Sequence, residues 1–387
     1  MAEPVGALRG HLRLPRGDQG GPPSRSAGDA RAGAASTHRQ PAGARRAWPA
    51  NDRAAPQGRA GAAVRADVTP PLTPVLVGAT AVGKTVVAAA LAARLPLTVL
   101  SADARQVYRG LDVGTAKPDA EVRRRVPHVG LDLIAPGERY SAGRFARAAA
   151  TWLAEIRAGG RVPWVVGGTG FYVRALAEGL FREPPLEPAR RERLRGWAGE
   201  LAAPELARWA GRLDRRFAGG GRQRAARAVE VALLTGRALS WWQREARETG
   251  VMRPWYIHLT LPRETLHRRI AERVDRMLAA GLVTEVEHVL AGGVAPAAPG
   301  LDGVGYREVV AMLQGRLAAA GLREAIVVAT RQYAKRQETW FRNQLRSRSS
   351  VVGSRSDEVW TLDATPEPDK LAAAVLDRWR AITTDDR

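Results

Sequence analysis

The sequence contains no cysteine, which excludes disulfide bonds, thiolate catalysis and cysteine-ligated zinc. Its six histidines are scattered, without H-E-x-x-H or similar spacing, so we expect no transition metal held by protein ligands. No run of 18 apolar residues occurs, and we expect no membrane contact. At 387 residues and 45% hydrophobic content the chain can bury a sizeable core, and the lack of cysteine fits a reducing cytoplasm.

Lysine is also scarce, since only four of the 60 Lys+Arg residues are lysines: Lys84, Lys117, Lys335 and Lys370. The ammonium of lysine is a compact charge, whereas the guanidinium of arginine is larger and planar. A chain that uses arginine at most basic positions is expected to retain lysine where a compact charge is needed. Chance is the alternative for so small a sample. The net charge of +21 attracts polyanions, nucleic acid being the usual partner, although an arginine-rich genome bias would account for part of it.

One stretch, residues 74–85, has the pattern of a phosphate-binding loop. A short β-branched run leads into G-x-x-x-x-G-K-[ST], and the Ala/Leu-rich segment 86–94 that follows is typical of a helix. Backbone N–H groups and the helix start would face a phosphate, Lys84 would neutralise it, and Thr85 would hold Mg²⁺. The pattern does not say which phosphate compound binds. The predicted loop residues are Gly78, Ala79, Thr80, Ala81, Val82, Gly83, Lys84 and Thr85.

Apolar runs that alternate with helical patterns predict the fold class. Runs at 75–77, 97–100, 131–134 and 162–166, and a further run at 255–261, are typical of buried strands. Strands alternating with helices favour an α/β fold with a doubly wound parallel sheet, whose ligands bind at the carboxyl ends of the strands. Segment 182–250 is rich in Arg, Glu, Ala and Leu with helical spacing, which indicates a small helical subdomain inserted into this P-loop core.

We therefore divide the chain into five parts. The first is dominated by Ala, Gly, Pro and Arg without apolar periodicity, so we expect disorder or residues translated upstream of the true start; a nucleic-acid-binding arm and a transit peptide are the alternatives. The parts are an arm at 1–70, the first part of the core at 71–181, the inserted subdomain at 182–250, the second part of the core with basic helices at 251–348, and a tail with a final helix at 349–387.

Asp103 follows directly after the second predicted strand, on the side where the phosphate loop opens. A carboxylate there could coordinate Mg²⁺ or accept a proton, and the alternative is a cap on the next helix. The fourth predicted strand ends in Gly167 and Gly168, followed by Thr169, where an ATPase or GTPase would place a metal-holding aspartate. This argues against a nucleotide hydrolase, and we expect the glycines to let a large group approach the backbone.

Pairs of arginines at helical spacing lie in two predicted helices. Arg224 and Arg227 are three residues apart and could grip RNA, or form a solvated face. Arg269 and Arg273 are four apart in a helix predicted over 263–280, where an anion between them, or ion pairs with Glu264 or Glu272, would relieve their repulsion. A basic helix over 324–348 carries aromatics that suit RNA or the core.

Several blocks together resemble the tRNA dimethylallyltransferases, also called tRNA isopentenyltransferases. The resemblance runs in the family's order from about Val75 to Arg342. Besides the phosphate loop, its blocks are Ser101–Pro118, Val126–His128, Gly167–Tyr172, Gly305–Glu308, Arg331–Gln337 and Thr339–Arg342. Ordered blocks of this kind are far more specific than a phosphate loop alone.

This resemblance implies transfer of a dimethylallyl group from dimethylallyl diphosphate to the amine of an adenosine beside the anticodon of certain tRNAs. It implies Mg²⁺ as cofactor and the anticodon stem-loop of tRNA as partner, and we expect a monomer. The implied catalytic residues are Asp103 as proton acceptor, Thr169 near the path of the base, and Arg273 facing the diphosphate. The implied tRNA-binding residues are Asp103, Ala104, Arg105, Gln106, Thr169, Arg191, Gln223, Arg224 and Arg227.

The sequence departs from the family pattern at three places. Ala104 follows Asp103 where serine is usual, Gly219–Gly221 stands where an Asn-Asp pair is common, and Arg144 replaces an acidic residue. Two other classes of function stay open on the residues alone. One is a small-molecule kinase or nucleotide-prenylating enzyme with a similar core, which would not need the inserted helices. The other is a non-catalytic RNA-binding P-loop protein, in which Asp103 and Lys84 would be replaceable.

Overall fold

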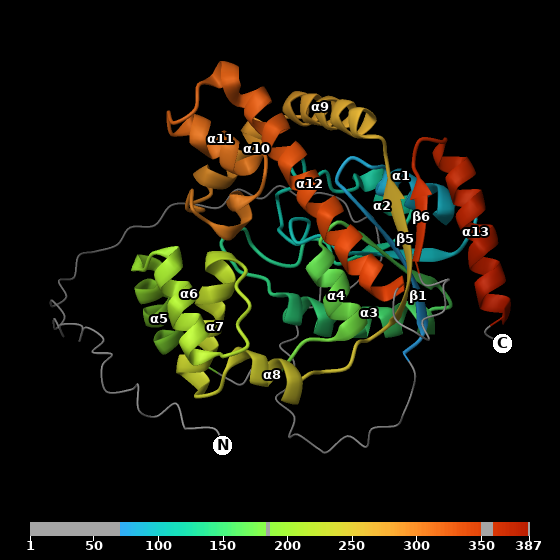
Figure 1. The fold of residues 1–387 in the computed structure, drawn as a ribbon. Helices are drawn as coiled ribbons and strands as arrows, with labels where there is room; N and C mark the ends of the chain where they lie inside the picture. The colour runs from blue at the N-terminus through green and yellow to red at the C-terminus, as the bar shows by residue number, and fades with distance from the viewer. Residues whose placement is uncertain (1–69, 183–185, 350–358, 386–387) are drawn as a thin grey trace, which may run out of the picture. The chain divides into compact units, whose positions relative to one another are not determined.

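A parallel sheet forms the centre of the fold in the computed structural model, which describes residues 70–182, 186–349 and 359–385. The arm predicted over 1–70 lies outside these residues, apart from Pro70. The strands run in the order β3-β2-β4-β1-β5-β6, and every pair is parallel (Figure 1). Their bounds are β1 Leu72–Gly78, β2 Leu97–Ser101, β3 His128–Val129, β4 Val162–Gly167, β5 Arg253–Thr260 and β6 Val359–Asp363.

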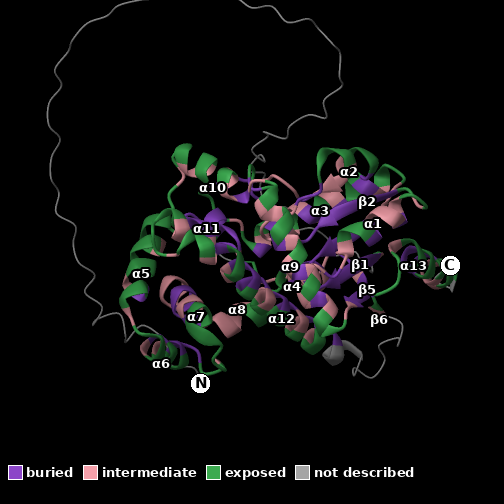
Figure 2. Cartoon of the chain, turned by 90° about the horizontal axis from the view of Figure 1, so that it is seen from above, coloured by how far each residue is buried: buried purple, intermediate pink, exposed green. Residues whose placement is uncertain are grey.

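Both faces of the sheet are covered, as continuous apolar strands require. Successive side chains of β1 point to opposite faces, so Val75 and Val77 pack with one cluster and Leu76 with another. On the second face Trp255 stacks on Trp379 of the last helix, with ring centroids 5.6 Å apart. Figure 2 shows the central strands as buried.

Helices lie outside the sheet, and four of them, α5 to α8, occupy the stretch between α4 and β5 (Figure 1). Helices α6 and α7 pack on each other through small and aliphatic residues such as Leu206, Ala210 and Val229. None of the described helices is both long enough and apolar enough to cross a membrane. The helices are α1 Lys84–Ala92, α2 Ala120–Arg125, α3 Ala142–Ala158, α4 Gly170–Glu178, α5 Pro188–Glu200, α6 Ala203–Leu213, α7 Gly221–Thr235, α8 Leu239–Glu245, α9 Arg263–Ala279, α10 Leu282–Ala291, α11 Tyr306–Leu313, α12 Leu322–Ser349 and α13 Pro368–Asp385, with short 3₁₀ turns at Pro299–Asp302 and Ala319–Gly321.

The strand predicted at 131–134 is wrong. The third strand is the two-residue β3, and the chain then turns at Gly130 (φ 86°) and Asp132 (φ 56°), both in the left-handed region that a strand excludes. The N–H groups of Leu133 and Ile134 both donate to the carbonyl of Val107, at 2.7 and 3.0 Å, instead of joining the sheet. The apolar run is thus buried in a turn.

Lys117 anchors this turn. Its side chain is 1% exposed, and its Nζ donates to the carboxylates of Asp112 and Asp132, both at 2.6 Å, and to the carbonyl of Tyr108. Asp132 also accepts from Arg123 at 2.8 Å. One buried ammonium therefore joins three points of the Ser101–Pro118 block and the turn after β3, a geometry that the compact charge of lysine suits.

We expect Lys117→Met to destabilise the fold by roughly 2–4 kcal/mol, because two carboxylates lose their buried partner while remaining partly hydrated. Urea unfolding followed by circular dichroism measures the change. Lys370→Met on the exposed face of α13 is the matched control and should shift the midpoint little. Equal midpoints for the two variants would contradict the anchoring role.

Candidate active site

The predicted phosphate loop joins β1 to α1 at the carboxyl edge of the sheet. Gly78 (φ 146°) and Gly83 (φ 109°) adopt backbone conformations that L side chains rarely take. A Cβ on Gly78 would also lie 2.5 Å from the carbonyl oxygen of Leu259 on β5. Glycine is therefore required at the two positions for different reasons. Gly78 packs closely against strand β5, and Gly83 adopts the left-handed conformation that leads into α1.

Lys84 points back into its own loop. Its Nζ donates to the carbonyls of Gly78 at 3.0 Å and Ala79 at 2.7 Å. Burial lowers its pKa to about 8; the charge of Asp103 opposes the shift, and the charge of Arg273 adds to it. An anion bound in the loop would stabilise the ammonium and raise this pKa again.

A cleft of about 370 Å³ opens in front of the loop. It brings together residues from five segments: the phosphate loop, the turn after β2, the end of β4, α9 and α12. Its lining includes Thr80, Gly83, Lys84, Thr85, Asp103, Gln106, Gly168, Arg269, Arg273, Tyr333 and Gln337.

Arg273 enters this cleft from α9. Within the described part of the chain it forms no ion pair, and the predicted alternative of pairing with Glu264 or Glu272 is not realised, because Glu272 pairs with Arg268 at 3.9 Å. Burial lowers the pKa of the Arg273 guanidinium, and the charge of Asp103 counteracts this. A partly buried cation without a carboxylate partner is typical of an anion-binding site.

Asp103 lies across the cleft from these cations. Its Oδ1 accepts a hydrogen bond from the N–H of Arg105 at 2.8 Å. The capping alternative is wrong, because the next helix, α2, begins at Ala120 and its cap is Asp119, which accepts from Val122 N–H. Asp103 is therefore a carboxylate held on a turn beside a phosphate loop.

Thr169 and Gln337 fix the walls of the cleft to one another. Thr169 Oγ1 accepts from the N–H of Ala104 at 2.9 Å, which ties the Asp103 turn to the end of β4. Gln337 of α12 donates through Nε2 to the carbonyl of Gly168 at 2.9 Å, and its Oε1 accepts from the N–H of Thr80 in the loop at 2.8 Å. One buried amide side chain thus joins α12, the phosphate loop and β4.

The glycines after β4 make room for the protein's own side chains. A Cβ on Gly168 would lie 2.2 Å from Nε2 of Gln337, and one on Gly170 would lie 2.1 Å from the Trp340 ring. The glycine pair predicted that a large group approaches the backbone here, and in the structure helix α12 does so.

The remaining predicted residues beside Asp103 hold the cleft in shape. Arg105 pairs with Asp302 and donates to the carbonyl of Pro299 at 3.0 Å. Gln106 accepts from Ser101 Oγ at 2.8 Å and lines the cleft. Ala104 contributes its backbone N–H to Thr169.

The arginines predicted in segment 182–250 do not line the cleft. Three arginines surround the buried carboxylate of Glu230: Arg191 at 2.8 Å, Arg195 at 2.9 Å and Arg227 at 2.5 Å. Burial acts to raise the Glu230 pKa, but the hydrogen bond from Arg195 and the three positive charges outweigh it and lower the pKa. Gln223 and Arg224 are exposed on the first turn of α7.

Two cleft residues had no role assigned from sequence. Tyr333 and Gln337 both come from the Arg331–Gln337 block, and their four-residue spacing puts them on one face of α12. Burial, followed by the charge of Asp103, raises the pKa of Tyr333 to about 12, so its hydroxyl keeps its proton at neutral pH. Their place in a family-like block and their helical spacing were the signals in the sequence that could have pointed to them.

Comparison with known proteins places this geometry in a family. The family model described as IPP transferase matches residues 106–344, and that of isopentenyl transferase matches 73–127. The chain belongs to the IPP transferase family. The family resemblance seen in the sequence is thereby confirmed, as is the P-loop α/β fold with helices outside the sheet.

Relatives with related names match most of the chain. A tRNA dimethylallyltransferase of Alkalilimnicola ehrlichii is 44% identical over 298 residues, which is 73% of this chain and 90% of the relative. One of Thiobacillus denitrificans is 45% identical over 281 residues, 69% of this chain and 88% of the relative. The tRNA isopentenylpyrophosphate transferase of Bacillus halodurans has a solved structure with a TM-score of 0.58 and 29% identity, covering 82% of this chain and 99% of that one.

We expect inorganic diphosphate to bind about tenfold more weakly at pH 9 than at pH 7. Above its pKa of about 8 the amine of Lys84 is mostly neutral in the free protein. Binding of the anion must then protonate the amine, which costs roughly 1.4 kcal/mol for each pH unit above the pKa. Calorimetric titration across this range measures the affinity. The variant Lys84→Arg keeps its positive charge over this pH range, so any remaining pH dependence in it comes from ionisation of the diphosphate itself. The same pH dependence in both proteins would show that titration of Lys84 is not its cause.

We expect Gln337→Met to weaken diphosphate binding and to destabilise the fold by about 1–3 kcal/mol, because the Thr80 N–H and the Gly168 carbonyl both lose their partner. Thermal unfolding and calorimetric titration provide the two readouts. Gln332→Met, on an exposed position of the same helix, is the control. Unchanged binding in Gln337→Met would show that the loop keeps its shape without this contact.

Proposed function

We propose that the chain transfers a dimethylallyl group from dimethylallyl diphosphate to the N6 amine of the adenosine 3′ to the anticodon, in tRNAs that read codons beginning with U, and releases diphosphate. The observation that carries the proposal is a carboxylate, Asp103, facing the cations Lys84 and Arg273 in one cleft, where its charge acts on both. Relatives named tRNA dimethylallyltransferase support the same reaction.

The reaction exchanges one bond to the allylic carbon for another. As the adenine N6 bonds to C1 of the dimethylallyl group, the bond from C1 to the diphosphate oxygen breaks and negative charge grows on the leaving group. Lys84, Arg273 and the N–H groups of the loop are placed to stabilise that charge. The amine becomes strongly acidic as it is alkylated, so the carboxylate of Asp103 is a sufficient acceptor for its proton.

Magnesium fits this cleft only through the substrate. Within the described residues there is no group of three or more His, Cys, Asp or Glu that could hold a metal, so the diphosphate oxygens would provide most ligands. Thr85 is exposed at the cleft and its hydroxyl would be the protein ligand. When bound, Mg²⁺ would neutralise charge on the leaving diphosphate.

The tRNA would contact the helices α5 to α8. Glu230 orders Arg191, Arg195 and Arg227 around it, and exposed Arg224 lies on the same helix as Arg227. Ordered cations suit the phosphate backbone of an anticodon stem-loop. The target adenosine lies in a loop, where it leaves its stack at low cost to enter the cleft.

A kinase is the less favoured function. Strand β4 ends at Gly167 and is followed by Gly168 and Thr169, so the aspartate that holds the metal in P-loop NTPases is missing at that position. We propose that the enzyme acts as a monomer in the cytoplasm.

We expect Asp103→Ala to reduce turnover by at least about 100-fold, the lower range for a proton-transfer group, while tRNA affinity stays nearly unchanged. Labelled dimethylallyl diphosphate, Mg²⁺ and unmodified tRNA, followed by nucleoside analysis, provide the rate; filter binding gives the affinity. Asp377→Ala on the exposed face of α13 is the control.

Full turnover in Asp103→Ala would refute the assigned role. No transfer by the unmutated protein, combined with phosphate transfer from ATP, would refute the proposed function and favour the kinase.

A further inference from the structure

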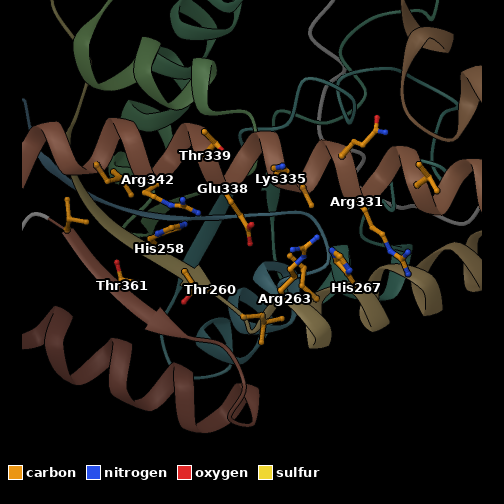
Figure 3. A pocket seen from close by; sticks show the side chains of 17 residues that line it. His258, Thr260, Arg263, His267, Arg331, Lys335, Glu338, Thr339, Arg342 and Thr361 are labelled. Carbon is orange, nitrogen blue, oxygen red and sulfur yellow. The ribbon is translucent and has the colours of Figure 1, made fainter.

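A second, larger cleft of about 990 Å³ lies between α9, α12, the carboxyl end of β5 and the first half of β6 (Figure 3). Its charged lining is mainly cationic. Glu338 is the one carboxylate among the described lining residues, and burial raises its pKa although the charge of Arg342 opposes this. The cations are Arg263 from α9 and Arg331, Lys335 and Arg342 from α12.

These four cations outnumber the single carboxylate among the described residues of the lining. In the parts of the chain that the structure describes, none of them pairs with a carboxylate, and the buried Nε of Arg331 has no hydrogen-bond partner. Arg331, Lys335 and Arg342 recur at spacings of four and seven on one face of α12. Like charges gathered around one cavity repel unless an anion lies among them.

His258 provides a second, independent observation. It is 8% exposed, it lines the cleft, and its Nε2 is buried without a hydrogen-bond partner. Burial, together with the charges of Arg342 and Lys84, lowers its pKa to about 4, so the ring is neutral at pH 7. Figure 3 shows the ring beside Arg342. Buried polar atoms in native structures are normally paired, so an unpaired one at a cavity wall indicates a ligand group.

The second cleft is separate from the active site. Helix α12 lines the active-site region with Ile326, Thr330, Tyr333 and Gln337, and the second cleft with Arg331, Lys335, Glu338 and Arg342. The two sets are offset by five residues, which is a rotation of roughly 140° about the helix. Leu266 and Ala334 pack against Ala79 of the phosphate loop and form a wall between the two spaces.

The lining also has an apolar part. Leu261, Leu266, Val328, Leu345 and Val359 contribute it, while Thr260, Thr339 and Thr361 add hydroxyl groups. Cations for phosphate oxygens, hydroxyls for a sugar and an apolar wall for a base are the groups that a nucleotide requires, and the volume suits a ligand of that size.

We propose that this cleft is a second anion-binding site and that it takes a free nucleoside phosphate, with the phosphates near Arg263 and Arg342. An RNA backbone carries the same phosphates, but α5 to α8, which carry the predicted tRNA contacts, lie on the other side of the molecule from β6 (Figures 1 and 2). The inference goes beyond the proposed function and does not depend on it.

The test separates the two sites by removing the phosphate loop's cation. ADP is titrated calorimetrically into the full chain carrying Lys84→Ala, then into the same chain with Arg263→Ala and Arg342→Ala added. We expect ADP to bind the first protein, and the affinity to fall at least about tenfold in the second, since charged hydrogen bonds are lost. Arg268→Ala, an exposed arginine of α9, is the matched control and should leave the affinity unchanged.

Three results would overturn the proposal: no ADP binding to Lys84→Ala, equal binding after removal of the two arginines, or displacement of ADP by an anticodon stem-loop RNA. Dimethylallyl transfer by the otherwise unmutated Arg263→Ala/Arg342→Ala protein is measured in parallel. If the variant still transfers the dimethylallyl group, it is folded. If the unmutated protein does not transfer the group, that result bears on the proposed function and not on the second site.

Discussion

The pair of hydrogen bonds made by Gln337 is the contact on which the rest of the active site depends. Its amide joins the N–H of Thr80 to the carbonyl of Gly168, and so holds the phosphate loop against the end of β4. Thr169 continues the connection to the turn that carries Asp103. Because Gln337 is buried and each backbone group has a partner in it, the phosphate loop and the turn that carries Asp103 are held in place relative to each other.

The electrostatics of the cleft follow from this fixed geometry. Lys84 and Arg273 lose hydration on one wall, and Asp103 on the other wall offsets part of the loss. In the proposed reaction the cations would therefore be in place before the diphosphate binds, and moving them would not be part of the reaction. The carboxylate favours the charged form of both cations, and in the proposed reaction it would also accept the proton.

Local patterns in the sequence predicted most of the sheet and the phosphate loop, because those depend on short-range periodicity and on glycines at fixed spacing. The strand at 131–134 was wrong, since periodicity alone cannot distinguish a buried turn held by Lys117 from a buried strand. Strand β6 and the role of Gln337 were missed, because their partners lie far away along the chain; Gln337 and Thr80 are 257 residues apart. Asp103 was singled out by its place after a predicted strand and Arg273 by its spacing from Arg269, the family resemblance added their roles, and the structure places both in one cleft.

Two faces of helix α12 line different clefts. Tyr333 and Gln337 line the active-site cleft, and Lys335 and Arg342 line the second cleft. One added or deleted residue before this stretch would rotate everything after it by about 100°. Such a change would turn Gln337 away from Gly168 and put Arg336, after an insertion, or Glu338, after a deletion, in its place. The length of this helix is thus as strongly constrained as any single side chain on it, whereas a surface loop of similar length would absorb the same insertion.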